Sequence, residues 1–168
     1  MNASRIFSIA LASTLAMASG AAVAGTAEVR FVDPDRMSDL AANKWQERDN
    51  IEALTNHIKH LAARLPANQV LQVDVLDVDL AGSPVFSSRK GENLRIMNNG
   101  ADAPKIHLRW TLQAAGQTST GEERLTELDY VHHELASRRS STPLYYEKRL
   151  LDQWFSRHFA PQRQADAR

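Results

Sequence analysis

Three aspartates stand close together in the sequence, at Asp74, Asp77 and Asp79. Carboxylate oxygens are the ligands that calcium and magnesium prefer, so such a cluster can hold a divalent cation. Asp77 and Asp79 are two residues apart and would point to the same face of a strand. They lie among Val and Leu, however, whereas calcium loops are usually punctuated by glycine. A structural role for these acids in turns or caps is therefore the alternative.

Two histidines offer a second kind of metal ligand. His57 and His60 are three residues apart in a segment with helical periodicity, so both imidazoles can share a face and bind zinc or copper. No third ligand follows at a spacing typical of a metal site, and His132–Glu134 would have to be brought near by the fold. Exposed histidines on a helix flank and in a loop are the alternative interpretation.

Motifs of the common catalytic sites are absent from the sequence. The chain has no G-x-S-x-G, no H-E-x-x-H, no phosphate-binding glycine loop and no cysteine nucleophile. We therefore expect a non-catalytic protein without a cofactor, and a metal-dependent enzyme or metal carrier is the alternative. The 20 basic and 20 acidic residues balance, so charge gives no reason to expect nucleic acid as a partner.

The first residues have the pattern of a secretory signal peptide. One cation, Arg5, precedes an apolar run from Ile6 to Met17, and small residues follow it. Ala22-Val23-Ala24 fits the small-x-small rule of signal peptidase, which predicts a signal peptide over 1–24 and cleavage near Ala24. The apolar run is shorter than a membrane span, and no cysteine is present to carry a lipid. We expect a periplasmic or secreted protein without a membrane anchor.

Periodicity predicts the elements that would position the candidate residues. Apolar residues at helical spacing predict a helix over about 45–65, and a second is expected over about 143–159, with an N-cap at 140–142 and Pro143 at its first position. Alternation and turn residues predict the strands. We expect them at about 29–31, 70–80, 94–97, 105–114 and 118–130, with 81–91 as turn and loop.

The strand that begins at Val70 changes phase midway. Apolar and polar residues alternate up to Val75, but Asp77 and Asp79 then occupy the positions that should continue the core face. Either a bulge after Val75 resets the register, or two carboxylates point inward.

These elements predict an α+β fold. Its expected form is a two-layer sandwich in which a mostly antiparallel sheet of about five strands carries two helices on one face. Residues 25–160 have the length of a single α+β domain. The tail 161–168 has no large apolar side chain and is expected to be disordered.

Aromatic residues concentrate in the second helix, at Tyr145, Tyr146, Trp154 and Phe155. Such a stripe belongs either to the core or to a groove that binds an apolar partner. We expect the polar residues Glu147, Lys148 and Arg149 to face mainly solvent. If the protein is a binding module, its partner is an envelope protein or peptide engaged through this helix or a sheet edge.

Two segments together resemble a known family. They are Asp77-Val78-Asp79-Leu80-Ala81-Gly82 and Leu144-Tyr145-Tyr146-Glu147-Lys148-Arg149-Leu150-Leu151, the latter followed by Trp154-Phe155. With Phe31, Asp33 and Leu65-Pro66, they make the chain similar, over about 29–159, to domain-of-unknown-function family 3016 of exported proteobacterial proteins. The resemblance implies export but no activity, substrate or cofactor.

The resemblance directs attention to the aspartate strand and the start of the last helix. The candidate binding residues are Asp77, Asp79, Tyr145, Glu147, Lys148 and Arg149. An open pocket lined by them would favour ligand binding. A closed seam, in which Lys148 or Arg149 meets Asp77 or Asp79, would favour architecture.

Overall fold

The computed structural model describes residues 24–89, 91–97, 102–128 and 143–159. The expected signal peptide up to residue 23, the segment His132–Glu134 and the tail 161–168 lie outside the described residues. The elements in chain order are β1 (Thr26–Phe31), the short 3-10 helix η1 (Pro34–Arg36), α1 (Lys44–Ala62), β2 (Val70–Asp79), β3 (Ser83–Ser87), β4 (Glu92–Ile96), β5 (Lys105–Ala114), β6 (Gln117–Thr126) and α2 (Tyr145–Phe159).

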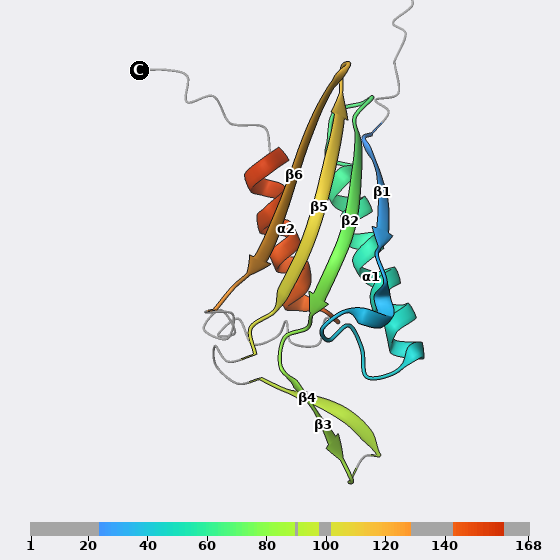
Figure 1. Cartoon of the computed structure of the whole chain (residues 1–168), viewed down its shortest axis with the longest axis vertical. Coiled ribbons are helices and arrows are strands. Elements are labelled where there is room, and N and C mark those ends of the chain that lie inside the picture. The colour runs from blue at the N-terminus through green and yellow to red at the C-terminus, as the bar shows by residue number, and fades with distance from the viewer. Residues whose placement is uncertain (1–23, 90, 98–101, 129–142, 160–168) are drawn as a thin grey trace, which may run out of the picture.

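One four-stranded sheet has the order β1-β2-β5-β6, with β1 parallel to β2 and the other neighbours antiparallel. Both helices cover the same face of this sheet (Figure 1). The predicted α+β class is confirmed. The main sheet has four strands, not about five, because β3 and β4 leave it and pair with each other.

A register shift between Val75 and Asp77 interrupts the pairing of β2 with β5. Of the two interpretations of the phase change, the bulge is therefore confirmed. Beyond it, Val78 is fully buried while Asp77 and Asp79 remain partly exposed opposite His107 and Lys105. The bulge thus keeps both carboxylates on the sheet face that the helices leave open.

The core lies between the sheet and the two helices. Trp154 and Phe155 of α2 are buried in it, and Tyr146 is buried in a smaller cluster with Ala81 and Ala103. The aromatic stripe of α2 is therefore mainly core, and only Tyr145 is half-buried. Trp110 of β5 extends this core over Gly121, where an added Cβ would lie 2.7 Å from the indole ring.

Several predicted boundaries are wrong. The last strand ends at Thr126 and not at about residue 130. The segment 81–91 is not all turn and loop, because it contains β3. The β-forming residues Val85 and Phe86 lie in this strand, which pairs with β4. The second helix does not begin at Pro143, because Leu144 has a φ of 56°, in the left-handed region. The first helix ends at Ala62, before the predicted end at residue 65. The predicted cap at 140–142 lies outside the described residues.

The β3–β4 hairpin projects from one end of the sandwich, away from the sheet and both helices (Figure 1). The side chains of Val85, Phe86 and Ile96 on it are exposed to 43, 65 and 49%. Across the described residues, no helix has the length and apolarity required to cross a membrane.

Candidate functional site: a polar seam at the base of the hairpin

The segment Leu80-Ala81-Gly82 carries the chain from β2 into the hairpin, and we call it the crossover segment. Each of its backbone N–H groups donates to an acceptor from a distant part of the chain. The acceptors are the Asp39 carbonyl for Leu80 at 3.1 Å, the Glu147 carboxylate for Ala81 at 2.7 Å and the Asp102 carbonyl for Gly82 at 3.1 Å.

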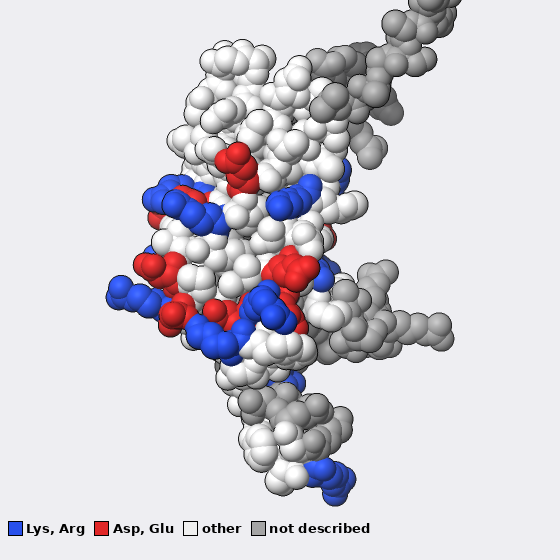
Figure 2. Space-filling model, turned by 90° about the vertical axis from the view of Figure 1, so that its right-hand side faces the viewer, with Lys and Arg blue, Asp and Glu red and all other residues white. Residues whose placement is uncertain are grey.

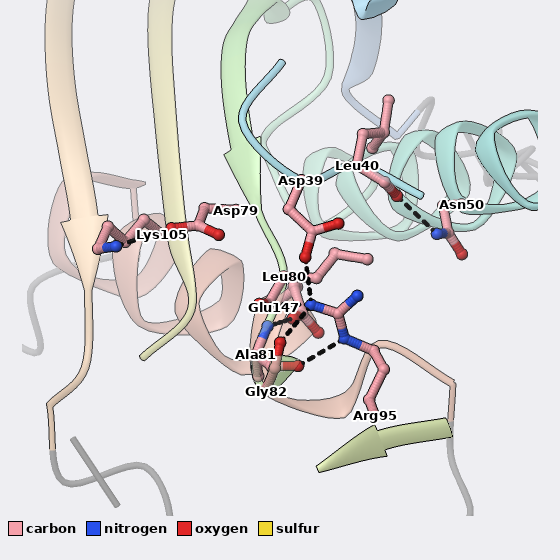
Figure 3. A network of polar contacts seen from close by, with 10 residues as sticks. All are labelled: Asp39, Leu40, Asn50, Asp79, Leu80, Ala81, Gly82, Arg95, Lys105 and Glu147. Carbon is pink, nitrogen blue, oxygen red and sulfur yellow. Dashed lines mark hydrogen bonds and ion pairs between the residues drawn. The ribbon is translucent and has the colours of Figure 1, made fainter. Parts of the chain in front are cut away.

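Arg95 of β4 binds the carbonyl side of the same segment. Its guanidinium donates to the carbonyl oxygens of Leu80 at 2.9 Å and Ala81 at 2.8 Å, and also to that of Gly82. It also forms an ion pair of 2.6 Å with the carboxylate of Asp39 (Figure 3). All six backbone polar groups of the crossover segment are therefore satisfied, and its path is fixed from both sides.

Asp39 is itself held in place on the outer side of this network. Its N–H donates to the Val78 carbonyl at 2.9 Å, so it lies alongside the end of β2. The next residue, Leu40, accepts a hydrogen bond of 2.8 Å from the Asn50 side chain of α1 (Figure 3). The first helix thereby contributes to the position of the Asp39 carboxylate.

Glu147 is 3% exposed, so the expectation that it faces solvent is wrong. Burial raises the pKa of its carboxyl, and the bond from the Ala81 N–H and the nearby charges of Arg95 and Lys148 only partly oppose this. A buried carboxylate needs a partner. The partner here is the backbone of the crossover segment.

The other predicted site residues are engaged separately. Asp79 pairs with Lys105 at 2.7 Å, and Asp77 accepts bonds from the N–H and hydroxyl of Ser38 at 2.7 and 2.8 Å. Arg149 pairs with Glu127 at 3.1 Å. Neither Asp77 nor Asp79 meets Lys148 or Arg149 among the described contacts. The two family-like segments meet instead at the bond between Ala81 and Glu147.

The candidate metal ligands do not come together in the described part of the chain. His57 bonds to the Asp152 carboxylate at 2.8 Å, and His60 is exposed on α1. Among the described residues, no group of three or more His, Cys, Asp or Glu side chains is placed to hold a metal ion.

Residues 25–157 match the family described as Protein of unknown function (DUF3016). The chain belongs to the DUF3016 family. Both segments that carry the resemblance lie inside the match, and in space they meet in the polar seam, which consists of the crossover segment, Asp39, Arg95 and Glu147. No curated protein and no solved structure matches the chain significantly.

The open sheet face of this DUF3016 chain carries a second polar cluster. Asp74 accepts bonds from Arg30 at 2.9 and 3.0 Å and from Arg109 at 3.0 Å. The bond from Arg30, with further help from Arg109, lowers the pKa of the Asp74 carboxyl. The cluster borders a shallow hollow of about 360 Å³.

Positive and negative side chains are interspersed around this hollow. Glu28 and Asp74 balance Arg30 and Arg109 in its lining. The side of the molecule in Figure 2 shows the same mixture, with Lys and Arg next to Asp and Glu across its middle. The hollow therefore has no excess charge to select an ion of either sign.

Sequence reasoning missed Arg95 and Asp39, the ion pair at the centre of the seam. No local signal distinguished Arg95, because a polar residue between Leu94 and Ile96 is the ordinary alternation of a strand. Nothing local to Asp39 marks it, since its role depends on residues from β2, β4 and α1.

Proposed function

We propose that this DUF3016 protein is an exported, non-catalytic binding module of the cell envelope, and that the β3–β4 hairpin engages its partner. The observation that carries the proposal is the exposed apolar surface of that hairpin. Val85, Phe86 and Ile96 lie on a two-stranded arm projecting from the sandwich. Exposed apolar side chains grouped on one element are typical of an interaction site.

The seam supports this proposal because its contacts restrict the conformations of the β3–β4 hairpin. A hairpin of two strands has marginal stability by itself. Here Arg95 and Glu147 bind the segment from which the hairpin starts. An arm fixed before binding loses less conformational entropy when it meets a partner.

The chemistry of the arm favours an extended segment of another envelope protein as the partner. In the described structure β3 and β4 pair only with each other, so their outer edges have backbone groups for an added strand. The register places Val85 and Ile96 on one face of the hairpin and Phe86 on the other, so both faces of the arm carry an exposed apolar side chain. Arg89, between the two strands, is exposed and favours a segment with apolar and acidic residues.

Two sequence observations support export. The first 24 residues have the order of regions found in signal peptides, and the family match begins at Gly25, where the processed chain is expected to start. Cell fractionation and N-terminal sequencing test this part. A periplasmic or secreted protein that begins near Gly25 supports export, whereas an uncleaved cytoplasmic protein contradicts it.

Site-specific cross-linking in the periplasm tests the binding arm. A photoreactive residue at position 86 is compared with one at position 45, because Phe86 and Trp45 are both 65% exposed. The protein cross-linked at position 86 is then identified and purified. We expect Phe86→Ser to weaken its binding at least about tenfold and Trp45→Ser to change it less than about twofold.

Stability is measured on both variants, since loss of an exposed side chain should leave folding unchanged. No adduct at position 86, equal adducts at both positions or equal affinities of both variants would contradict the proposal.

A further inference from the structure

Strand β6 is an edge of the main sheet and is ten residues long. The loop that joins it to β5 has two residues, Ala115 and Gly116, both with positive φ, so Ala114 and Gln117 close the hairpin as a hydrogen-bonded pair. In an antiparallel pair, hydrogen-bonded residues alternate along the strand. Residues 118, 120, 122, 124 and 126 therefore direct their backbone N–H and C=O groups away from β5.

The charges on this edge have a self-complementary order. Glu122 and Arg124 lie two residues apart on the open face of the sheet. Glu122 is bonded to His107 at 2.9 Å, whereas no ion pair is found for Arg124 among the described residues. A second strand of the same sequence would offer a carboxylate to Arg124 and a cation to Glu122.

We propose that two copies of this chain associate through β6, antiparallel and with the two-fold axis at Glu123. This register places Glu122 of each copy opposite Arg124 of the other, and Thr120 opposite Thr126. Both members of each pair direct their backbone groups outward, so the strands can exchange hydrogen bonds. The result is one continuous sheet of eight strands.

Charge selects this register over its neighbours. A shift of the axis to Glu122 puts two carboxylates opposite each other, and a shift to Arg124 opposes two guanidiniums. In the proposed register the two Glu123 residues face each other on the helix side. Each has partners within its own copy, the His158 ring at 2.6 Å and the Arg157 guanidinium at 4.0 Å, and the charge of Arg157 reduces their repulsion.

The arrangement has a consequence beyond binding by a single arm. Antiparallel pairing keeps the helices of both copies on one face of the sheet and places the two β3–β4 hairpins at opposite ends. A dimer of this form presents two partner-binding arms that point apart.

Charge-swap variants test the dimer. The mature protein, purified from the periplasm, is examined by sedimentation equilibrium over a range of concentrations. We expect a dimer whose dissociation constant rises at least about tenfold in Glu122→Arg and in Arg124→Glu, because each change opposes like charges twice. The double variant restores both pairs and should return the constant to within about threefold of the wild-type value.

Glu28→Arg on β1 is the matched control, since it reverses a carboxylate on the same sheet face at the other edge. Circular dichroism verifies that all variants are folded. A monomer at every concentration would overturn the proposal. A dissociation constant that the single variants leave unchanged, or one that the double variant does not restore, would overturn it as well.

Discussion

The carboxylate of Glu147 accepts a hydrogen bond of 2.7 Å from the N–H of Ala81, a residue 66 positions earlier in the chain. This bond joins the start of α2 to the segment between β2 and the projecting hairpin. The family-like residues therefore meet in a closed seam, where they serve the architecture of the fold. The surface that we propose for binding lies further out, on the hairpin that starts from the seam.

Replacement of Glu147 separates its hydrogen bond from its charge. Glu147→Ala leaves the buried Ala81 N–H without an acceptor, and we expect the free energy of unfolding to fall by about 2–3 kcal/mol. Glu147→Gln keeps an acceptor oxygen and should cost less than about 1 kcal/mol at neutral pH. Urea unfolding of the two variants measures both values. Equal losses would show that the Ala81 bond is not the important contact.

The raised pKa of Glu147 predicts how the stability of the protein depends on pH. A carboxyl whose pKa is higher in the folded than in the unfolded protein binds its proton more tightly in the folded protein. The stability that this proton contributes is complete below the unfolded pKa and is lost as pH rises through the folded pKa. Above about pH 4, where an ordinary glutamate begins to lose its proton, the stability of wild type should therefore fall relative to Glu147→Gln. If the stability of wild type rose relative to that of Glu147→Gln over this range, burial would not be the dominant influence on the pKa of Glu147.

Gly121 is predicted to be essential for the packing of Trp110. The added Cβ of Gly121→Ala would lie 2.7 Å from the indole, so the ring must shift within a packed core. We expect a loss of about 1–3 kcal/mol in unfolding free energy and a changed near-ultraviolet circular dichroism spectrum. Thr120→Ala, at the neighbouring exposed position, is the control. Similar stabilities of the two variants would refute the steric argument.

The aspartates of β2 give a prediction about metal. Asp77 and Asp79 already accept bonds from Ser38 and Lys105. We therefore expect the native mass and the thermal midpoint of the mature protein to be the same before and after treatment with a chelator. A stoichiometric metal that is lost to the chelator would contradict the structural role given to these residues.

Local sequence patterns predicted much of the fold for identifiable reasons. Strict alternation identified β5, and the phase change in β2 left two interpretations, a bulge or inward carboxylates, of which the pairing register contains the bulge. Both features arise from neighbouring residues on one strand.

The seam was beyond such patterns, because its contacts join residues far apart in the chain. Glu147 stands among charged residues at the start of a helix, and only the crossover segment packed against it makes it buried. Arg95 likewise acquires its role from carbonyls that β2 and the hairpin bring together. Short-range periodicity contains no information on such pairings.

Hydrogen exchange at the crossover segment tests the central claim most directly. Amide exchange of Leu80, Ala81 and Gly82 is measured by NMR in wild type, in Arg95→Ala and in Arg89→Ala, an exposed control on the same hairpin. If the seam is locked architecture, the three wild-type amides exchange only through global unfolding, with a protection free energy equal to that from urea. Arg95→Ala should lower their protection by about 2–4 kcal/mol, and Arg89→Ala should not. Rapid exchange of these amides in wild type, or unchanged protection in Arg95→Ala, would contradict the account.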